Sequence, residues 1–346
     1  MVTFAEASEY KKHIARSMLK LEKVQAVGVG YRDPKRPDQG AAILIYAVTF
    51  SPASVGIRSN GSVQGSDFPI RVVRTGKLRA NADSFYSRRV RPVQPGYSIG
   101  TTNVSGTLGL IVADCANPSH RYLLSNNHVL TKPLNGKTRA ATLQPGGQDD
   151  GQLRRDRVGK LERLALLRRS GPNYIDAAIS TPVGKRILDP RYPTVGTVPG
   201  HVTSYRVGER FVKVGQTTGL RYGVVESVDT DVLVDYGKLG LLLFENQTIV
   251  RGTRPVSLPG DSGSVWLRRS DHYAAAVNFA GTTDGRVSVA FPVDWAMQAF
   301  RIRAARPCGA GRVRNVLRKS RAYAPPLTPK QLSSIQVIQT TSPGAK

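Results

Sequence analysis

Short apolar runs rich in β-branched residues, each followed by turn residues, dominate the pattern along the chain. Residues 24–32, 40–48 and 68–78 have this character, and turns rich in Pro, Asp, Gly and Ser separate them. Further along, residues 106–114 and 121–125 predict two paired strands around a polar turn. With Gly 34 and Pro 22, the pattern predicts a mainly β protein.

Two segments instead have the spacing of an amphipathic helix, in which apolar residues recur at i, i+4 and i+7. The first covers residues 6 to about 26, and its apolar face consists of Ile14, Met18 and Leu21. The second covers residues 292–304, and its apolar face consists of Val293, Met297 and Phe300. We expect one helix to open the protein and the other to close its β-rich region.

The chain of 346 residues exceeds the usual size of one hydrophobic core, so we expect more than one domain. The predicted division is an N-terminal α+β domain at 1–85, a linker at 86–97, a β-rich domain at 98–304 and a C-terminal tail at 305–346. The Gly-Val-Gly stretch at 28–30 lacks the third glycine and the following helix of a phosphate-binding loop, so close strand packing is its expected role.

Charge is strongly unbalanced toward the basic side. Lys and Arg number 50 against 24 acidic residues, a formal net charge of +26, and no acidic residue follows Asp294. The arginine-rich stretch 301–323 predicts a basic, flexible tail that binds nucleic acid non-specifically. A solvated basic surface without a specific ligand is the alternative, and acidic proteins or anionic membrane faces also fit the charge.

Cysteine content and the N-terminal pattern suggest a cytoplasmic protein with no membrane segment. Two cysteines far apart in sequence could not staple a chain of this size, and charges interrupt the N-terminal residues where a signal peptide needs an apolar core. Cys115 and His120 form an isolated pair without further spaced ligands, so we expect no metal and no cofactor.

Three residue types able to support nucleophilic catalysis stand in distinctive settings. His128 directly follows a buried-looking strand, Asp176 is the single carboxylate in an otherwise uncharged stretch, and Ser262 lies on a Gly-Asp-Ser-Gly turn before an apolar strand. Each has an ordinary alternative, namely a structural histidine, a turn-capping aspartate and a simple turn serine. A buried carboxylate nevertheless needs donors, and an imidazole N–H is a suitable one.

The chain order His128, Asp176, Ser262 is that of chymotrypsin. The segments LLSNNHVL, YIDAAIS and GDSGS resemble the histidine, aspartate and nucleophile segments of trypsin-like serine proteases over roughly residues 98–300. VKVGQTTGLRYGVVESVD, at 212–229, resembles bacterial relatives of the plant narrow-leaf type protease, which also tend to carry a small α+β domain before the protease.

This resemblance implies two six-stranded antiparallel β-barrels of chymotrypsin type and a serine endopeptidase acting through an acyl-enzyme. Ser262 would be the nucleophile, His128 the general base and then acid, and Asp176 the residue that orients His128. The amides of Gly260 and Ser262 would form the oxyanion hole. Ser264, in the same motif, is expected to have no chemical role.

The resemblance also indicates a substrate pocket with Val256 at its base and Phe279 and Ala280 in its wall. Because no carboxylate stands at Val256, we expect small or apolar side chains to be preferred over basic ones. Asp261 is expected to make a local bond, since no activation cleavage site precedes the domain. A protein or peptide is the expected substrate, and self-association into a homo-oligomer is a further expectation.

Two functions of other classes stay open at this point. A protease fold can bind a peptide without cutting it, which would make the chain a catalytically latent scaffold. The basic tail could instead make the chain a nucleic-acid-associated protein, whose binding would weaken steeply with salt.

Overall fold

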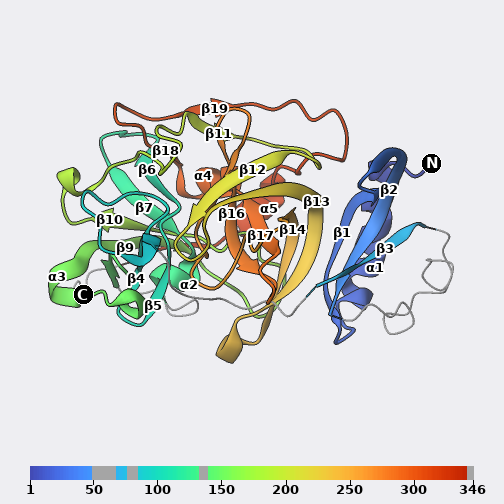
Figure 1. The fold of residues 1–346 in the computed structure, drawn as a ribbon, viewed down its shortest axis with the longest axis horizontal. Coiled ribbons are helices and arrows are strands. Elements are labelled where there is room, and N and C mark those ends of the chain that lie inside the picture. The colour runs from blue at the N-terminus through green and yellow to red at the C-terminus, as the bar shows by residue number, and fades with distance from the viewer. Residues whose placement is uncertain (49–67, 76–84, 132–138, 341–346) are drawn as a thin grey trace.

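The computed structural model describes residues 1–48, 68–75, 85–131 and 139–340. It is mainly β, as the sequence predicts, and its strands form two sheets that lie side by side in Figure 1, with the N-terminal unit at one end. Within the described ranges, no helix is both long and apolar enough to cross a membrane.

The N-terminal unit consists of a helix against a three-stranded layer: α1 Phe4–Met18, β1 Val24–Asp33, β2 Arg36–Ala47 and β3 Ile70–Arg74. A capping box at Thr3 and Glu6 starts α1. Ile14 and Met18 are buried as expected, but the helix ends at Met18 and Val24 already belongs to β1. The predicted helix to residue 26 is therefore too long. The predicted strand segment 76–78 lies outside the described residues.

The first sheet is built from nine strands: β4 Ser98–Thr101, β5 Val104–Thr107, β6 Leu110–Asp114, β7 Arg121–Ser125, β8 Ala141–Leu143, β9 Arg157–Ala165, β10 Ala178–Pro182, β18 Ile302–Ala304 and β20 Val337–Gln339. Its pairing order is β18-β6-β7-β10-β9-β8-β4-β5, with β20 added to β9. Leu108 and Gly109 connect β5, at one end of this order, to β6, next to its other end.

The second sheet holds eight strands of the β-rich region: β11 Gly200–Val202, β12 Arg210–Gly215, β13 Gly219–Asp235, β14 Leu241–Arg251, β15 Val265–Arg268, β16 Ala274–Gly281, β17 Val287–Pro292 and β19 Arg312–Arg314. Six of them form a closed ring, because β12 pairs with both β15 and β13. The N-terminal strands β1, β2 and β3 continue the same sheet beyond β13.

Pairing of β1 with β13 depends on the glycines of the Gly-Val-Gly stretch. A Cβ on Gly28 would collide with the Thr230 side chain, and one on Gly30 would lie 2.7 Å from the Glu226 carbonyl oxygen. Close strand packing is thus the role these glycines have, as the sequence predicts. It unites the N-terminal unit with the β-rich region in one continuous sheet.

Short helices fill the corners of the fold: α2 Asn127–Leu130, α3 Leu153–Asp156, α4 Val293–Phe300 and α5 Pro329–Ser334. Single 3-10 turns lie at Phe85–Ser87, Gly147–Asp149, Lys185–Ile187 and Gly237–Leu239. The helix predicted at 292–304 buries Val293, Met297 and Phe300, yet it ends at Phe300 because Arg301 takes a left-handed conformation with φ 53°. The following residues form β18 instead.

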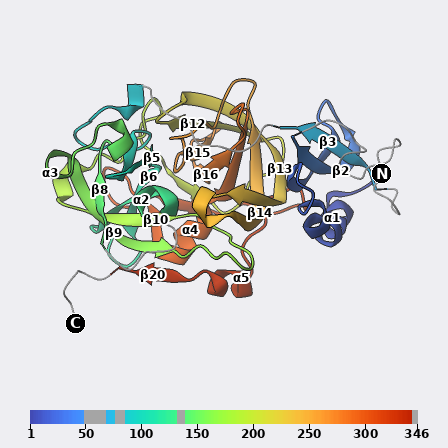
Figure 2. The same cartoon turned by 90° about the horizontal axis from the view of Figure 1, so that it is seen from below.

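The C-terminal segment follows the surface of the β-rich region and does not hang free as a tail. Strand β19 pairs with β11, and β20 pairs with β9 at the lower edge of the view in Figure 2. Along the chain between β19 and β20, the side chains of Ala324 and Leu327 are buried. This corrects the expected flexible tail for residues 305–340, because backbone pairing and two apolar anchors hold the segment.

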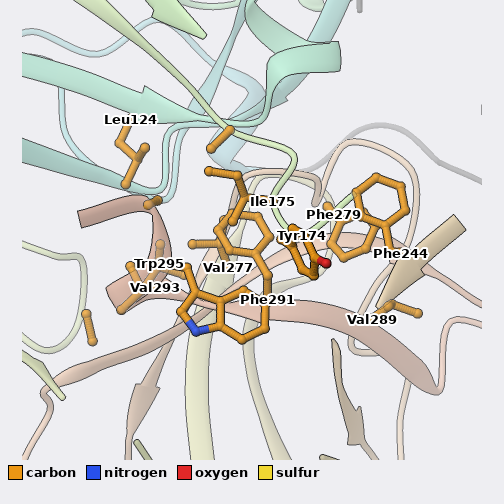
Figure 3. Packing of buried hydrophobic residues seen from close by; sticks show 14 of the residues in the cluster. Leu124, Tyr174, Ile175, Phe244, Val277, Phe279, Val289, Phe291, Val293 and Trp295 are labelled. Atoms are coloured by element: carbon orange, nitrogen blue, oxygen red, sulfur yellow. The ribbon is translucent and has the colours of Figure 1, made fainter. Parts of the chain in front are cut away.

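Several aromatic residues pack together in the core against the second sheet. Figure 3 shows the Phe279 ring beside Phe244, with Phe291 and Trp295 further along the same cluster. The ring centroid of Phe279 lies 4.7 Å from that of Phe244 and 6.1 Å from that of Phe291. This packing fixes β14, β16 and β17 relative to one another, and the turn that carries Ser262 and the Asp176 segment are attached to these strands.

Candidate active site

His128 and Asp176 form a hydrogen-bonded pair in the structure. His128 lies in α2, directly after β7, and Asp176 precedes β10, which pairs with β7. The His128 Nδ1 atom contacts Asp176 Oδ2 in a short bond, so the other ring nitrogen, Nε2, is left for a different partner. Asp176 is fully buried, whereas 22% of the His128 side chain is exposed.

Main-chain and side-chain donors compensate the buried Asp176 carboxylate. Its Oδ1 atom accepts the N–H of Asn127 at 2.7 Å and of His128 at 3.3 Å, and Oδ2 accepts the Tyr236 hydroxyl at 2.5 Å. Burial alone would raise the pKa of Asp176, but the His128 charge and these bonds outweigh burial and hold the pKa below its ordinary value. Asp176 is therefore ionised at neutral pH.

The turn that carries Ser262 packs against the segment that joins β5 to β6. Thr107 donates its N–H to the Ser262 carbonyl oxygen and its hydroxyl to the Gly260 carbonyl oxygen, both at 2.7 Å. Ser125, at the end of β7, donates its hydroxyl to the Thr107 carbonyl oxygen at 2.7 Å. Thr107 thus joins the turn that carries Ser262 to the strand that leads into His128.

Two glycines allow the backbone of this turn to fold. Gly260 and Gly263 have φ of 94° and 92°, a left-handed conformation that costs glycine little and other residues more. A Cβ on Gly263 would also collide with Ser125 and with the Thr107 carbonyl oxygen. Among the described residues, the N–H groups of Gly260 and Ser262 have no acceptor, which leaves both as donors for a bound anion.

Among the hydrogen bonds of the described residues, none joins the Ser262 hydroxyl to His128. Its hydroxyl, in a residue 7% exposed, has a long 3.4 Å contact to the Phe279 carbonyl oxygen. Ser264, by contrast, is fully buried and donates to the Asp261 carbonyl oxygen at 2.6 Å. Of the two serines, only Ser262 is weakly bound and partly accessible.

Asp261 makes local bonds, as expected from the sequence. Its carboxylate accepts the N–H groups of Leu258, Thr217 and Thr218 at 3.0 to 3.1 Å, and Lys213 Nζ lies 3.5 Å away. Lys213 is fully buried beside the Trp266 ring. These contacts tie the turn that carries Ser262 to β12 and to the turn that follows β12.

The three residues expected around a substrate pocket occupy different environments. Val256 is fully buried next to Gly252, and the Phe279 ring, 3% exposed, faces the core. Phe279 therefore presents its carbonyl oxygen, and not its ring, to Ser262. Ala280 is half-buried on β16.

Sequence reasoning missed two residues of this site. Lys213 belongs to the Lys-Val-Gly segment already noted in the sequence, where a lysine in an apolar strand was a signal of a buried charge. Tyr236 follows Asp235 in a glycine-containing turn, and nothing in the sequence indicates that it contacts Asp176. In the described ranges, no three His, Cys, Asp or Glu side chains come together as a metal site requires.

The chain matches no family model and no curated protein. Solved structures that are similar to it include a glutamic acid specific serine protease, with 17% identity, 61% of this chain and 100% of that chain covered, and a TM-score of 0.44. Thermobifida fusca Protease A has 17% identity, 62% and 100% coverage and a TM-score of 0.42. Nocardiopsis Protease has 16% identity, 61% and 99% coverage and a TM-score of 0.43. At these low scores the function has to be inferred from the chain's own site.

Proposed function

We propose that this chain is a serine endopeptidase that hydrolyses peptide bonds through an acyl-enzyme on Ser262. The observation that carries the proposal is the buried His128–Asp176 pair, with Ser262 on a glycine turn bonded to the adjoining strands. A serine hydroxyl is a weak nucleophile at neutral pH and needs a neighbouring base. The pairing of Nδ1 with Asp176 makes Nε2 of His128 that base.

In the acylation step, Ser262 Oγ attacks the scissile carbonyl carbon while its proton moves to His128 Nε2. The negative charge that forms on the carbonyl oxygen is bound by the Gly260 and Ser262 N–H groups, a contribution of about 3 kcal/mol per preorganised donor. The C–N bond then breaks as His128 gives the proton to the leaving amine. Water, deprotonated by His128, attacks the ester and releases the acid and Ser262.

Activation of Ser262 requires its hydroxyl to leave the Phe279 carbonyl oxygen and turn to His128. Its contact to the Phe279 carbonyl oxygen, at 3.4 Å, is long for a hydroxyl hydrogen bond and costs little to break. Hydrogen bonds between nucleophile and base are often loose in free enzymes and tighten when substrate binds. We infer that a bound peptide turns the Ser262 hydroxyl toward His128.

The same Ser262 contact favours a second candidate, a latent scaffold that binds peptides without cutting them. In that state the hydroxyl stays on Phe279 and His128 does not activate it. For a protease in either state, the absence of a carboxylate at Val256 supports a preference for small or apolar side chains. A peptide library cleaved mainly after Lys or Arg would contradict this preference.

A third candidate follows from the exposed basic strand β19. Arg312 and Arg314 are both exposed, and Arg318 and Arg321 follow along the surface. Non-specific binding of nucleic acid through these side chains would weaken steeply as salt is raised. Binding of a single-stranded oligonucleotide that is unaffected between about 50 and 200 mM salt would argue against this candidate.

Covalent labelling by a fluorophosphonate probe, detected by intact mass, tests the proposed activity. We expect wild type and Ser264→Ala to gain one probe, and Ser262→Ala and His128→Ala to gain none. Ser264→Ala is the matched control, because it removes a hydroxyl from the same turn. Folded wild type that takes up no probe would favour the latent scaffold, and loss of labelling in Ser264→Ala alone would refute the assignment of Ser262.

A further inference from the structure

Strands β13 and β14 form a long hairpin whose tip reaches the candidate active site. Tyr236 lies at this tip, directly after β13, and Figure 2 shows the hairpin tip next to α2. The Tyr236 hydroxyl donates to Asp176 Oδ2 at 2.5 Å. Its ring meets the His128 ring edge-on, with centroids 5.7 Å apart and planes at 83°, and stacks on Phe244 at 6.0 Å.

Tyr236 shares with His128 the oxygen atom on which the pair depends. Both donate to Oδ2 of Asp176, whereas Oδ1 is occupied by main-chain N–H groups of α2. Burial and the neighbouring Asp176 carboxylate raise the pKa of Tyr236 well above its ordinary value, so the hydroxyl keeps its proton and donates. The hydrogen bond from Tyr236 fixes Oδ2 of Asp176, and the Tyr236 ring packs against the His128 imidazole. Together these contacts limit the rotation of the His128 and Asp176 side chains.

The same hairpin carries the segment that contains Asp176. Asn173 exchanges main-chain hydrogen bonds with β14, donating to the Leu243 carbonyl oxygen at 2.9 Å and accepting the Glu245 N–H at 3.0 Å. The Gln247 side chain donates to the Tyr174 carbonyl oxygen at 3.1 Å. A displacement of the hairpin would therefore move Tyr236 and the Asp176 segment together.

The N-terminal unit binds this hairpin directly. Strand β1 pairs with β13 at Ala26 with Val232 and at Val27 with Asp231, a few residues before Tyr236. From α1, Lys11 reaches the hairpin with only 1% of its surface exposed. Its Nζ lies 2.9 Å from Asp231 Oδ1 and 2.6 Å from the Asp229 carbonyl oxygen.

One further contact joins α1 to β13, and another ties β13 to β14. The Ser8 hydroxyl donates to the Asp229 carboxylate in a short bond. Asp231 Oδ1, which binds Lys11, also accepts the N–H of Asn246 at 3.1 Å, so one carboxylate ties β13 to β14. A buried lysine that meets two aspartates is costly to separate from them, which makes this junction stiff.

We propose that Tyr236 is a positioning residue for the His128–Asp176 pair and that the N-terminal unit holds Tyr236 in place through Lys11 and strand β13. The proposal rests on the proposed function of His128 and Asp176. It gives the N-terminal unit a physical route to the active site, from α1 through the hairpin to the carboxylate. A ligand that displaced α1 from β13 would act on catalysis by this route.

Tyr236→Phe tests the first half of the proposal, since it removes one oxygen atom and keeps the ring packing. We expect fluorophosphonate labelling at neutral pH to slow about tenfold, as for loss of one hydrogen bond to a charged group. The acidic limb of the pH–rate profile should move to higher pH. A carboxylate without the Tyr236 bond attracts the His128 imidazolium more strongly.

The groups that contact the Asp176 carboxylate in the described chain are His128, Tyr236 and the Asn127 main-chain N–H, and only the first two titrate. A shift of the profile in Tyr236→Phe therefore reports on this cluster. Unchanged labelling rate and unchanged profile in Tyr236→Phe would overturn the positioning role, because a residue with only a packing role keeps both.

Lys11→Met and Ser8→Ala test the second half, with Lys12→Met as the control because Lys12 is an exposed lysine paired with Glu9. We expect Lys11→Met to slow labelling about fivefold, because it removes a charged hydrogen-bond donor. Ser8→Ala removes a neutral donor and should slow labelling about twofold. Ser8→Ala leaves no buried charge unpaired, so it keeps the test usable where Lys11→Met does not fold. Lys11→Met combined with Tyr236→Phe should be no slower than Tyr236→Phe alone. Additive slowing, or equal slowing by Lys12→Met, would refute the route through Tyr236.

An NMR titration of the His128 ring in wild type and Tyr236→Phe separates this inference from the proposed function. It needs no turnover and no labelling. A midpoint that rises in Tyr236→Phe supports the positioning role even where wild type takes up no probe, a result that would count against protease activity alone. An unchanged midpoint refutes the positioning role.

Discussion

Lys213 Nζ lies 3.5 Å from Asp261 Oδ2, and neither side chain has any exposed surface. The pair joins β12 to the turn that carries Ser262, next to the Trp266 ring. Burial lowers the pKa of Lys213, and the Asp261 charge acts in the opposite direction. Because both side chains are shielded from water, loss of one partner leaves the other as a buried charge without compensation.

Lys213→Met should therefore destabilise the protein and disorganise the turn that carries Ser262. We expect a loss of about 3–5 kcal/mol in the free energy of unfolding, measured by urea denaturation, and loss of fluorophosphonate labelling. Lys160→Met, at an exposed position of β9, is the control and should change neither. Full labelling in Lys213→Met would show that the turn keeps its shape without the ion pair.

Gly263→Ala should abolish labelling by steric conflict. The added methyl group meets Ser125 and the Thr107 carbonyl oxygen, in addition to the cost of φ at 92°. Gly171→Ala isolates that second cost, because Gly171 has φ of 87° and no atom within 4 Å of its Cβ position. We expect Gly171→Ala to cost about 1 kcal/mol and to label normally. Equal behaviour of the two variants would contradict the packing described for the turn.

Acid should remove the stability that ionised Asp176 contributes. The pKa of Asp176 in the folded chain lies below its ordinary value of 3.8, so between the two values the unfolded chain binds more protons than the folded one. Stability then rises with pH in that window, and the contribution is complete above about pH 5 and is lost as pH falls through the folded pKa.

Urea denaturation of wild type and Asp176→Asn at about pH 3 and pH 6 measures this dependence. The difference in unfolding free energy between the two proteins should be larger at the higher pH. Other carboxylates titrate in both proteins and cancel in the comparison. A difference that grows as pH falls would mean that Asp176 is protonated in the folded chain.

Gly28→Ala should weaken the attachment of the N-terminal unit. A Cβ there collides with Thr230 and lies 2.9 Å from the Ser227 hydroxyl, on the strand that β1 pairs with. We expect a loss of about 1–3 kcal/mol, the usual cost of overpacking, and slower labelling through the hairpin. Gly184→Ala, whose Cβ position is open, is the control. An unchanged unfolding midpoint would show that β1 can shift without cost.

Much of the architecture was readable from local pattern. Turn residues and β-branched runs predicted the strands, and the i, i+4, i+7 spacing predicted α1 and α4. Both helices were predicted too long, because the left-handed Arg301 and the start of β1 at Val24 are set by neighbouring strands. The C-terminal segment was misjudged for a related reason: its charges suggested a free tail, whereas its pairing with β11 and β9 depends on strands far away in sequence.

The sequence by itself determined which residues could carry the chemistry, because an isolated carboxylate in an apolar run and a serine between glycines are local features. Only the tertiary structure decided which of them meet. The pairing of β7 with β10 brings His128 to Asp176, and Thr107 binds the turn of Ser262 to the neighbouring strand. The contacts of Lys213 with Asp261 and of Tyr236 with Asp176 are visible only in the tertiary structure. They depend on strand register and on how the strands of the second sheet pair.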